Sequence, residues 1–124
     1  MKIIIAGGRD FNNYYILEKV LNSFKELIDE VISGDARGAD ELGARWATSN
    51  NIHVNHFPAD WDYYGKAAGF IRNIEMADNA DALIAFWDNK SKGTGHMIKT
   101  MQMKKKPYWV FNYKGEEVMK GGQL

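Results

Sequence analysis

The sequence predicts an α/β fold, a Rossmann-like three-layer sandwich built on a mostly parallel five-stranded sheet. Short apolar segments rich in β-branched residues alternate five times with segments of helical periodicity, a pattern typical of parallel sheets covered on both faces. The first apolar run, Ile3 to Ala6, leads directly into Gly7 and Gly8, which lets the chain turn sharply where a strand ends. Because crossovers between parallel strands are right-handed, we expect the strand order 3-2-1-4-5.

Each element is predicted from its local pattern. Strands are expected at residues 3–6, 30–33, 52–57, 82–87 and 108–112. The first helix follows the capping residues Asn12 and Asn13, with apolar positions as far as Ile28, and further helices are expected at about residues 39–50, 66–78 and 94–105. The helix at 66–78 is expected to turn five residues to the core: Ala67, Phe70, Ile71, Ile74 and Ala77. Residues 59–65 are expected to form a loop, and the polar tail, 113–124, to fray or to form an edge hairpin.

Composition limits the classes of protein to which the chain can belong. Its 124 residues suffice for one domain, 1–124, and its 16 basic residues balance its 16 acidic ones. Proteins that bind nucleic acid backbones normally carry a basic excess, so nucleic acid is not an expected partner. The chain has no cysteine, its apolar run at Ile3 to Ala6 is too short for the pattern of a signal peptide, and no apolar run is long enough for a membrane helix. We therefore expect a soluble, cytoplasmic protein with no membrane partner.

The segment from Ser91 to Gly95 is the leading candidate for binding a phosphate group. It joins an expected strand to an expected helix, where unpaired backbone amides attract anions. Gly93 and Gly95 allow close approach, and Ser91 and Thr94 offer hydroxyl groups. The alternative is an ordinary helix cap at Thr94. The segment is neither a Walker A loop nor a complete GxGxxG motif, so the known nucleotide fingerprints are absent.

Residues 33–40, SGDARGAD, form a second turn of the same kind. Gly34 and Gly38 would allow the turn, and Arg37 could pair with a phosphate group. Asp40 could accept a hydrogen bond from a ribose hydroxyl or simply stabilise the helix N-terminus.

Two further groups of residues are candidate ligand contacts. Gly7, Gly8, Arg9 and Asp10 leave the first strand, and they either line a site or form a tight turn with a solvated arginine. Arg72 and Asn73 lie within an expected helix, on an otherwise apolar face. The Arg72 guanidinium either binds an anionic ligand or pairs with a carboxylate, for which Glu75, Asp78 and the loop carboxylates are candidates.

No complete catalytic or metal-binding motif is present. Asp10, Asp88 and His96 are candidates for a general acid or base, but no spacing fixes a pair. The three histidines lack the spacing of a metal site, and neither a serine elbow nor a cysteine offers a nucleophile, so we expect no metal and no cofactor. Four aromatic residues could stack on a base or pack in the core or a lid: Trp61, Tyr63, Tyr64 and Trp87.

Four blocks in this order resemble the SLOG superfamily: GGRDF, SGDARGAD, FPADWDYYGKAAGFIRNIEMADNADALIAFWD and SKGTGHMI. This Rossmann-like group contains the LOG phosphoribohydrolases and the DNA-processing DprA proteins. The chain is most similar to the small stand-alone YspA-like branch, found in bacteria and phages and of unknown function. The resemblance spans nearly the whole chain, from Lys2 to about Asn112.

The resemblance implies a site for a nucleotide or a nucleotide derivative. It assigns phosphate binding to Gly93 and Thr94, and it matches Arg72 to the family's helix arginine. LOG enzymes cleave an N-glycosidic bond with a glutamate in a PGGxGTxxE motif, and Met97 stands at that position here. A methionine cannot stabilise an oxocarbenium ion or relay a proton.

Three functions are therefore consistent with the sequence and the resemblance. The leading hypothesis is a sensor or sequestering module that binds a nucleotide-type ligand, such as an ADP-ribose-like molecule or a nucleoside monophosphate, at the carboxyl ends of strands one and four. The alternatives are an N-glycosidic or phosphoribosyl hydrolase and, less favoured, a DprA-like protein that binds single-stranded DNA. LOG relatives are often oligomers, so a homo-oligomer is a further expectation.

Overall fold

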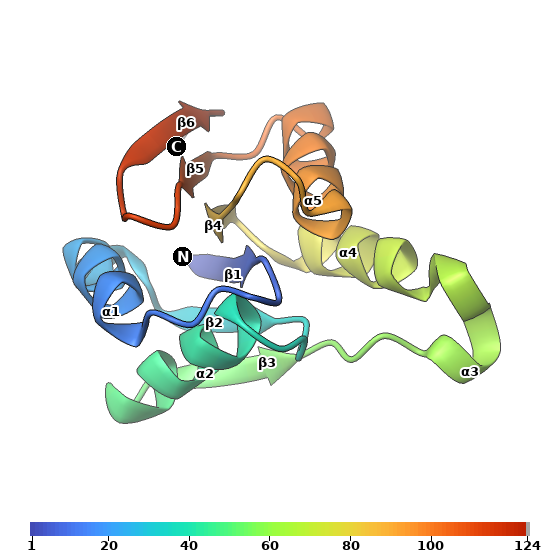
Figure 1. The fold of residues 1–124 in the computed structure, drawn as a ribbon, viewed down its shortest axis with the longest axis horizontal. Coiled ribbons are helices and arrows are strands. Elements are labelled where there is room, and N and C mark those ends of the chain that lie inside the picture. The colour runs from blue at the N-terminus through green and yellow to red at the C-terminus, as the bar shows by residue number, and fades with distance from the viewer. Residues whose placement is uncertain (124) are drawn as a thin grey trace.

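Six strands form one sheet in the order β3-β2-β1-β4-β5-β6, in a computed structural model that describes residues 1–123 (Figure 1). The strands are β1 (Lys2–Gly7), β2 (Glu30–Ser33), β3 (His53–His56), β4 (Ala82–Phe86), β5 (Tyr108–Phe111) and β6 (Glu117–Gly121). The α-helices are α1 (Tyr14–Ser23), α2 (Ala39–Ser49), α3 (Trp61–Tyr64), α4 (Ala68–Asn79) and α5 (Lys92–Met103). Two short 3-10 helices, Lys25–Leu27 and Gly65–Ala67, follow α1 and α3.

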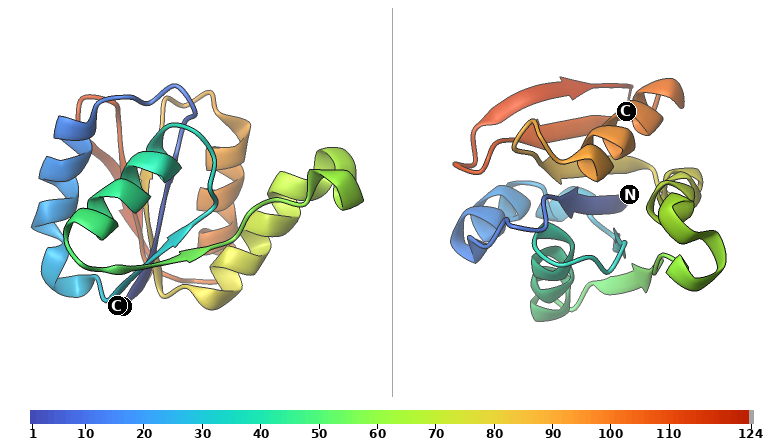
Figure 2. Two further views of the ribbon diagram at one scale, coloured as in Figure 1. Left: turned by 90° about the horizontal axis from the view of Figure 1, so that it is seen from below. Right: turned by 45° about the vertical axis from the view of Figure 1, so that its right-hand side comes forward.

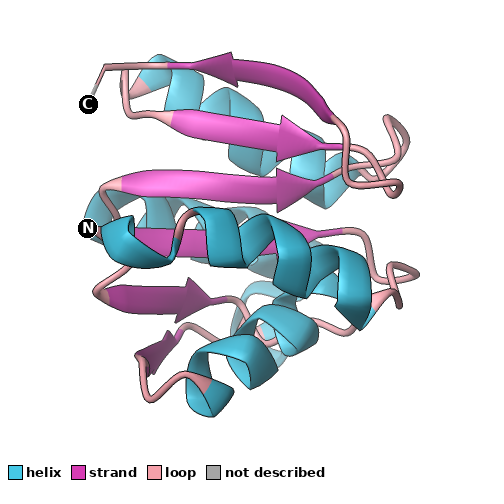
Figure 3. Cartoon of the chain, turned by 90° about the vertical axis from the view of Figure 1, so that its left-hand side faces the viewer, coloured by secondary structure: helices cyan, strands magenta, loops and turns pink. Residues whose placement is uncertain are grey.

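The sheet is parallel from β3 to β5 and confirms the predicted order 3-2-1-4-5. β1 lies at its centre, with Ile3 opposite Val31 of β2 and Ala82 of β4. Only β6 is antiparallel, and Figure 3 shows its arrow running against the others. The parallel strands therefore all end at one edge, where their exit loops gather.

Helices cover both faces of the sheet and confirm the three-layer sandwich (Figure 2). α1 and α2 lie on one face and α4 and α5 on the other. Successive side chains of β1 alternate between the layers, with Ile3 and Ile5 in the α1–α2 core and Ile4 in the α4–α5 core. All three are fully buried, and each such side chain stabilises the fold by about 1.5–3 kcal/mol.

The predicted inward face of the helix at 66–78 was right at Ala77, which is fully buried, and wrong at two other positions. Phe70 and Ile74 are 46% and 45% exposed. The helical residues buried here are Ala68, Asn73, Met76 and Ala77. The true inward face contains a polar residue, Asn73, whose side chain bonds to α5, and apolar periodicity alone therefore favoured the wrong rotation of the helix.

Residues 59–65 are not a simple loop, since they contain α3. Asp60 caps this short helix, because its carboxylate accepts a hydrogen bond from the Tyr63 amide (3.1 Å). We call residues 61–67 the arm, and it extends away from the sheet before α4 begins (Figure 1). The first helix also ends earlier than predicted, at Ser23, because the chain then tightens into the 3-10 turn, where Leu27 is 40% exposed.

The tail from 113 forms the edge hairpin, which adds a sixth strand to the predicted five. The Asn112 side chain accepts hydrogen bonds from the Lys114 and Glu116 amides (3.0 Å each), and Gly115 adopts a positive φ of 83°. This turn brings β6 back along β5, with Val110 opposite Met119. Leu124, the last residue of the predicted tail, lies outside the described residues.

Candidate functional site

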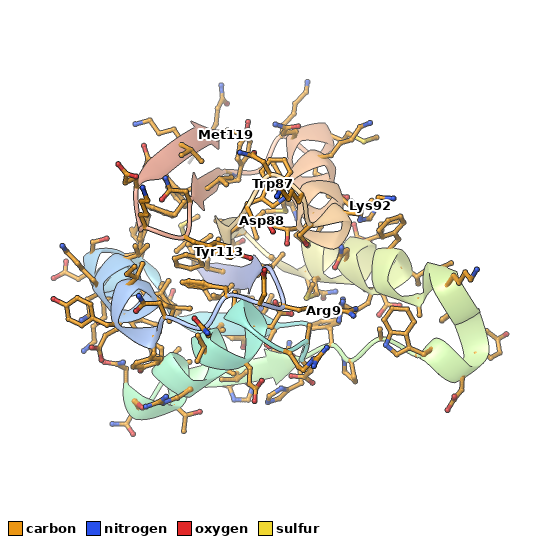
Figure 4. The ribbon with its side chains drawn as sticks, in the orientation of Figure 1. Arg9, Trp87, Asp88, Lys92, Tyr113 and Met119 are labelled. Carbon is orange, nitrogen blue, oxygen red and sulfur yellow. The ribbon has the colours of Figure 1, made fainter. Side chains whose placement is uncertain are left out.

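A cleft of about 440 Å³ lies where β1 and β4 end, and we call it the first cleft. Its walls come from the β1 exit, the start of α2, the arm, α4 and the start of α5. Figure 4 labels Arg9 and Lys92, which line it from the β1 exit and from α5. The volume falls within the range of about 300–1,000 Å³ that is typical of small-molecule sites.

Two glycines on the floor of the first cleft are closely surrounded. A β-carbon on Gly7 would overlap the Phe86 carbonyl oxygen and lie 2.7 Å from the Ala39 β-carbon. A β-carbon on Gly8 would overlap the Tyr113 hydroxyl group. The chain can therefore pass this close to β4 only with glycine at position 7, whereas at position 8 a shift of the Tyr113 side chain would make room.

The loop before α5 holds the helix N-terminus open toward the first cleft. The Asp88 carboxylate accepts hydrogen bonds from the amides of Lys90 (2.9 Å) and Ser91 (2.8 Å), and these bonds lower the pKa of Asp88. The first helical hydrogen bond runs from the Gly95 amide to the Ser91 carbonyl. Within residues 1–123 the amides of Gly93 and Thr94 have no acceptor, as expected in a first helical turn.

Gly93 leaves this end of the cleft unfilled. A β-carbon on Gly93 would meet no atom within 4 Å, whereas one on Gly95 would lie 3.2 Å from the Trp87 ring. The Trp87 indole N–H donates to the Ser91 carbonyl (3.0 Å), so this ring supports the loop from behind. The two glycines therefore differ in role, because Gly93 borders open space and Gly95 packs on a side chain.

Arg72 is fixed on one side of its guanidinium and unpaired on the other. Nε donates to the Asn73 side-chain oxygen (3.1 Å), and Nη1 donates to the carbonyls of Gly34 and Phe57. Within residues 1–123 no acceptor is bonded to Nη2. Burial lowers the pKa of Arg72, although the charge of Asp40 opposes this effect.

The carboxylates that the sequence offered as partners for Arg72 are not bound to it. Asp78 pairs with Lys104 instead, and no ion pair joins Arg72 to Glu75 within the described residues. Asp40 is the carboxyl group whose charge acts most on Arg72, and within the described residues no hydrogen bond or ion pair joins the two. Arg72 is thus held mainly by backbone carbonyls.

Asp40 is a buried carboxyl group on the wall of the first cleft. It is 5% exposed, and Oδ2 accepts a hydrogen bond from the Ala36 amide (3.4 Å). Burial raises the pKa of Asp40 to about 7, against the opposing charge of Arg72 and the hydrogen bonds from the Ala36 and Gly7 amides. The group therefore changes charge near neutral pH.

Asn73 connects α4 to the start of α5. Its Nδ2 donates to the Gly93 carbonyl (3.1 Å) and lies 3.2 Å from His96 Nδ1. The His96 ring stacks on Phe70 at 4.2 Å, and burial lowers its pKa, which favours the neutral form. His96 itself is not among the residues that line the cleft.

A second cleft, of about 520 Å³, adjoins the first. It lies at the exits of β2 and β3, and nine residues line it: Arg9, Gly34, Asp35, Ala36, Arg37, Pro58, Ala59, Trp61 and Arg72. Asp35, which adopts a positive φ of 59°, pairs with His56 Nδ1 at 2.6 Å.

The predicted ligand-binding residues divide between these places. Nine line the first cleft: Gly7, Gly8, Arg9, Asp10, Arg72, Asn73, Ser91, Gly93 and Thr94. Gly34 and Arg37 line the second cleft. Three of the predicted residues line neither cleft: Gly38, Asp88 and Gly95. They shape the backbone of the neighbouring loops instead. Gly38 adopts a positive φ of 78°, and a β-carbon there would overlap the Gly8 carbonyl oxygen.

Only some of the candidates for catalysis and for stacking on a base line a cleft. Asp10 lines the first cleft and accepts a hydrogen bond from the Tyr113 hydroxyl group (2.5 Å), while Asp88 does not line it. Burial, followed by the bond to Asp10, raises the pKa of Tyr113. Of the four aromatic candidates, Trp61 alone lines a cleft, and it lines both.

Two charged lining residues, Lys66 and Lys92, were not among the predicted ligand contacts, and Asp40 was offered as a contact to a ribose hydroxyl or as a residue that stabilises the helix start. Asp40 had a sequence signal, since it follows the glycine turn, but its burial could not be foreseen. No sequence signal pointed to Tyr113, which bonds to Asp10 on the cleft, because the two residues lie 103 positions apart in the chain. Among residues 1–123, no three acidic, histidine or cysteine side chains gather in a way that could hold a metal ion. In that same part of the chain, every helix is too short or too polar to cross a membrane.

Comparisons with known proteins identify the family and support the fold. A family model described as "YspA, cpYpsA-related SLOG family" matches residues 1–64. The Gene 61 protein of Mycobacterium phage D29 is 41% identical over 78 residues, which cover 58% of this chain and 62% of that protein. The chain thus spans less than two thirds of the relative that it matches.

Two solved structures of DNA processing protein A have a similar fold. The Streptococcus pneumoniae protein matches with a TM-score of 0.72 at 17% identity, over 90% of this chain and 49% of that one. The Helicobacter pylori protein, from a study of its single-stranded DNA binding mode, matches with a TM-score of 0.67 at 19% identity, over 90% of this chain and 65% of that one. At such identities the likeness concerns the fold.

Proposed function

Because the chain belongs to the YspA, cpYpsA-related SLOG family, we propose that it binds a nucleotide or nucleotide-derived ligand through a phosphate group in the first cleft. The observation that carries the proposal is the pairing of two sets of free donors on that cleft. The Nη2 group of Arg72 has no acceptor within residues 1–123, and neither do the amides of Gly93 and Thr94. A phosphate group offers the acceptor oxygens and the negative charge that both sets lack.

The ligand would be held by different parts of the cleft according to its chemistry. The α5 amides and Arg72 would bind phosphate, and Lys92 would add charge from the same helix end. Trp61, which is 49% exposed at the mouth, would stack against a base. The buried carboxyl group of Asp40 would accept a hydrogen bond from a sugar hydroxyl.

Thermal unfolding with AMP tests the proposal through two matched glycine variants. The Gly93→Ala variant places a methyl group in open space in the cleft, whereas Gly95→Ala adds the same group against Trp87, outside the cleft. Alanine is favoured over glycine in a helix by up to about 1 kcal/mol, so neither variant is expected to unfold. AMP should raise the melting temperature of the wild type and of Gly95→Ala, because it binds only the folded state, and should have much less effect on Gly93→Ala.

Arg72→Ala is expected to lose the AMP effect as well, although it also removes hydrogen bonds to two carbonyl groups. The absence of any AMP effect on the wild type, or an equal effect on both glycine variants, would contradict the proposal.

Asp40 favours a second candidate function, hydrolysis of an N-glycosidic or phosphoribosyl bond. A carboxyl group with a pKa of about 7 is suited to proton transfer at neutral pH, and Asp40 lies on the first cleft with Asp10. Met97, also on this cleft, takes the place of the LOG glutamate, so the acid would be a different residue. Mass spectrometry of AMP after incubation checks this candidate, which predicts free adenine and ribose 5-phosphate from the wild type and none from Asp40→Asn.

The fold shared with DNA processing protein A supports testing a third candidate, single-stranded DNA binding. The chain has no net charge, and binding to a DNA backbone would need a local basic surface. Fluorescence anisotropy with a labelled thymidine 20-mer would detect it, and affinity that falls steeply with salt would favour DNA over the nucleotide proposal.

A further inference from the structure

The first and second clefts are adjoining parts of one surface. Four residues line both of them: Arg9, Ala36, Trp61 and Arg72. Each cleft alone, at about 440 and 520 Å³, lies within the size range of a small-molecule site. A nucleoside monophosphate bound in the first cleft would leave the second unfilled.

Positive charge is concentrated where the clefts meet. The two charged residues that line both are arginines, Arg9 and Arg72. The carboxylates beside them already have partners, since Asp10 accepts from Tyr113 and Asp35 pairs with His56. Asp40, the carboxyl group whose charge acts most on Arg72, is buried, and burial raises its pKa to about 7. The boundary therefore offers two guanidinium groups to an anion.

The far side of the second cleft adds a third arginine. Arg37 lines this cleft and not the first, and its side chain is exposed. Within residues 1–123 it takes part in no hydrogen bond or ion pair that would hold it elsewhere. It is therefore available to bond the hydroxyl or phosphate oxygens of a group in the second cleft.

Building on the proposed function, we infer that the ligand is a two-ended nucleotide derivative of the nucleoside diphosphate sugar class that occupies both clefts at once. Its diphosphate would extend from the α5 amides of the proposed phosphate site to the boundary, where Arg9 and Arg72 meet it from the β1 exit and from α4. One end would fill the first cleft beside the start of α5, and the other would reach Arg37. Trp61 lines both clefts and would cover the junction.

Isothermal titration of the full chain with AMP and with ADP-ribose tests the inference. ADP-ribose contains AMP joined through a second phosphate to a second ribose, so the second cleft can act only on ADP-ribose. Because its two ends are linked, we expect ADP-ribose to bind at least about tenfold more tightly than AMP. Arg37→Ala should reduce this advantage to less than about threefold and leave AMP binding unchanged.

Arg45→Ala is the matched control. Arg45 is an exposed arginine of α2 that lies over the Tyr14 ring (4.1 Å), outside both clefts. Arg45→Ala removes one positive charge, as Arg37→Ala does, and should change the affinity for neither AMP nor ADP-ribose.

The outcomes separate this inference from the proposed function. Equal affinities for AMP and ADP-ribose, or an ADP-ribose advantage that survives Arg37→Ala, would overturn the two-cleft ligand and leave the phosphate site intact. Binding of neither compound to the wild type would overturn both. An ADP-ribose advantage lost in Arg37→Ala and kept in Arg45→Ala is the result expected here.

Discussion

The floor of the first cleft and the arm differ in how closely their residues are packed. At the floor, Gly7 and Gly8 are confined because a β-carbon on either would overlap neighbouring atoms. The arm, residues 61–67, contains no buried residue, and Tyr63 is 78% exposed. Packing therefore specifies the floor, at Gly7 above all, whereas the exposed residues of the arm contribute little to the stability of the fold.

The largest expected effect on stability comes from Asp40, on the wall of the same cleft. The folded state keeps the proton up to about pH 7, whereas the unfolded chain releases it near pH 3.8. Between these values the folded state binds more protons, so the free energy of unfolding falls as the pH rises, by on the order of 4 kcal/mol. Arg72 and Asp35 are the charged groups that face Asp40.

Urea unfolding of the wild type and of Asp40→Asn between pH 4 and pH 8 measures this effect. The asparagine cannot ionise, so the free energy of unfolding of Asp40→Asn should depend less on pH. The variant should therefore become more stable relative to the wild type as the pH rises. If the free energies of unfolding of the two proteins changed in parallel with pH, Asp40 would be ionised in the folded state over the whole range from pH 4 to pH 8.

Gly7→Ala should have the next largest effect. The added methyl group meets the Phe86 carbonyl oxygen and the Ala39 side chain in the packed centre of the molecule. We expect a loss of about 3 kcal/mol in the free energy of unfolding. Gly93→Ala is the same substitution at an open position of the same cleft, and it should lose nothing. Equal losses in the two variants would contradict the distinction between packed and open glycines.

The smallest effect on stability is expected at the arm. Trp61→Ala should change the free energy of unfolding by less than about 0.5 kcal/mol, as is usual for surface substitutions. It should nevertheless weaken ADP-ribose binding about tenfold if the indole stacks on the ligand. Tyr63→Ala, at an exposed position that lines neither cleft, should change neither quantity. A large loss of stability in Trp61→Ala would show that packing specifies the arm as it does the floor.

The sequence predicts the centre of this fold better than its margins. The three isoleucines of β1, the five parallel strands and their order are confirmed, and so is the resemblance to the SLOG superfamily. These features depend on apolar runs and glycine turns, which leave a direct trace in the sequence. β6 was only one of two alternatives for the tail, because a half-exposed edge strand with charged residues has a weak apolar pattern.

The site was predictable in its backbone and less so in its side chains. Glycines such as Gly7 and Gly93 mark strand exits and helix starts, and these come together whenever parallel strands end at one edge. The rotation of α4 was missed, so the sequence could not tell that Arg72 would be held by the carbonyls of Gly34 and Phe57. The Tyr113–Asp10 bond depends on the final hairpin and has no local signal.

The exposure of Trp61 also has an optical consequence. Of the four tryptophans, Trp46 is fully buried and donates its indole N–H to Asn22, while Trp61 is 49% exposed where the two clefts meet. A ligand that covers Trp61 would move part of the emission to shorter wavelength and leave the contribution of Trp46 constant. The chain therefore carries its own fluorescent reporter, and candidate ligands can be screened without labelling it.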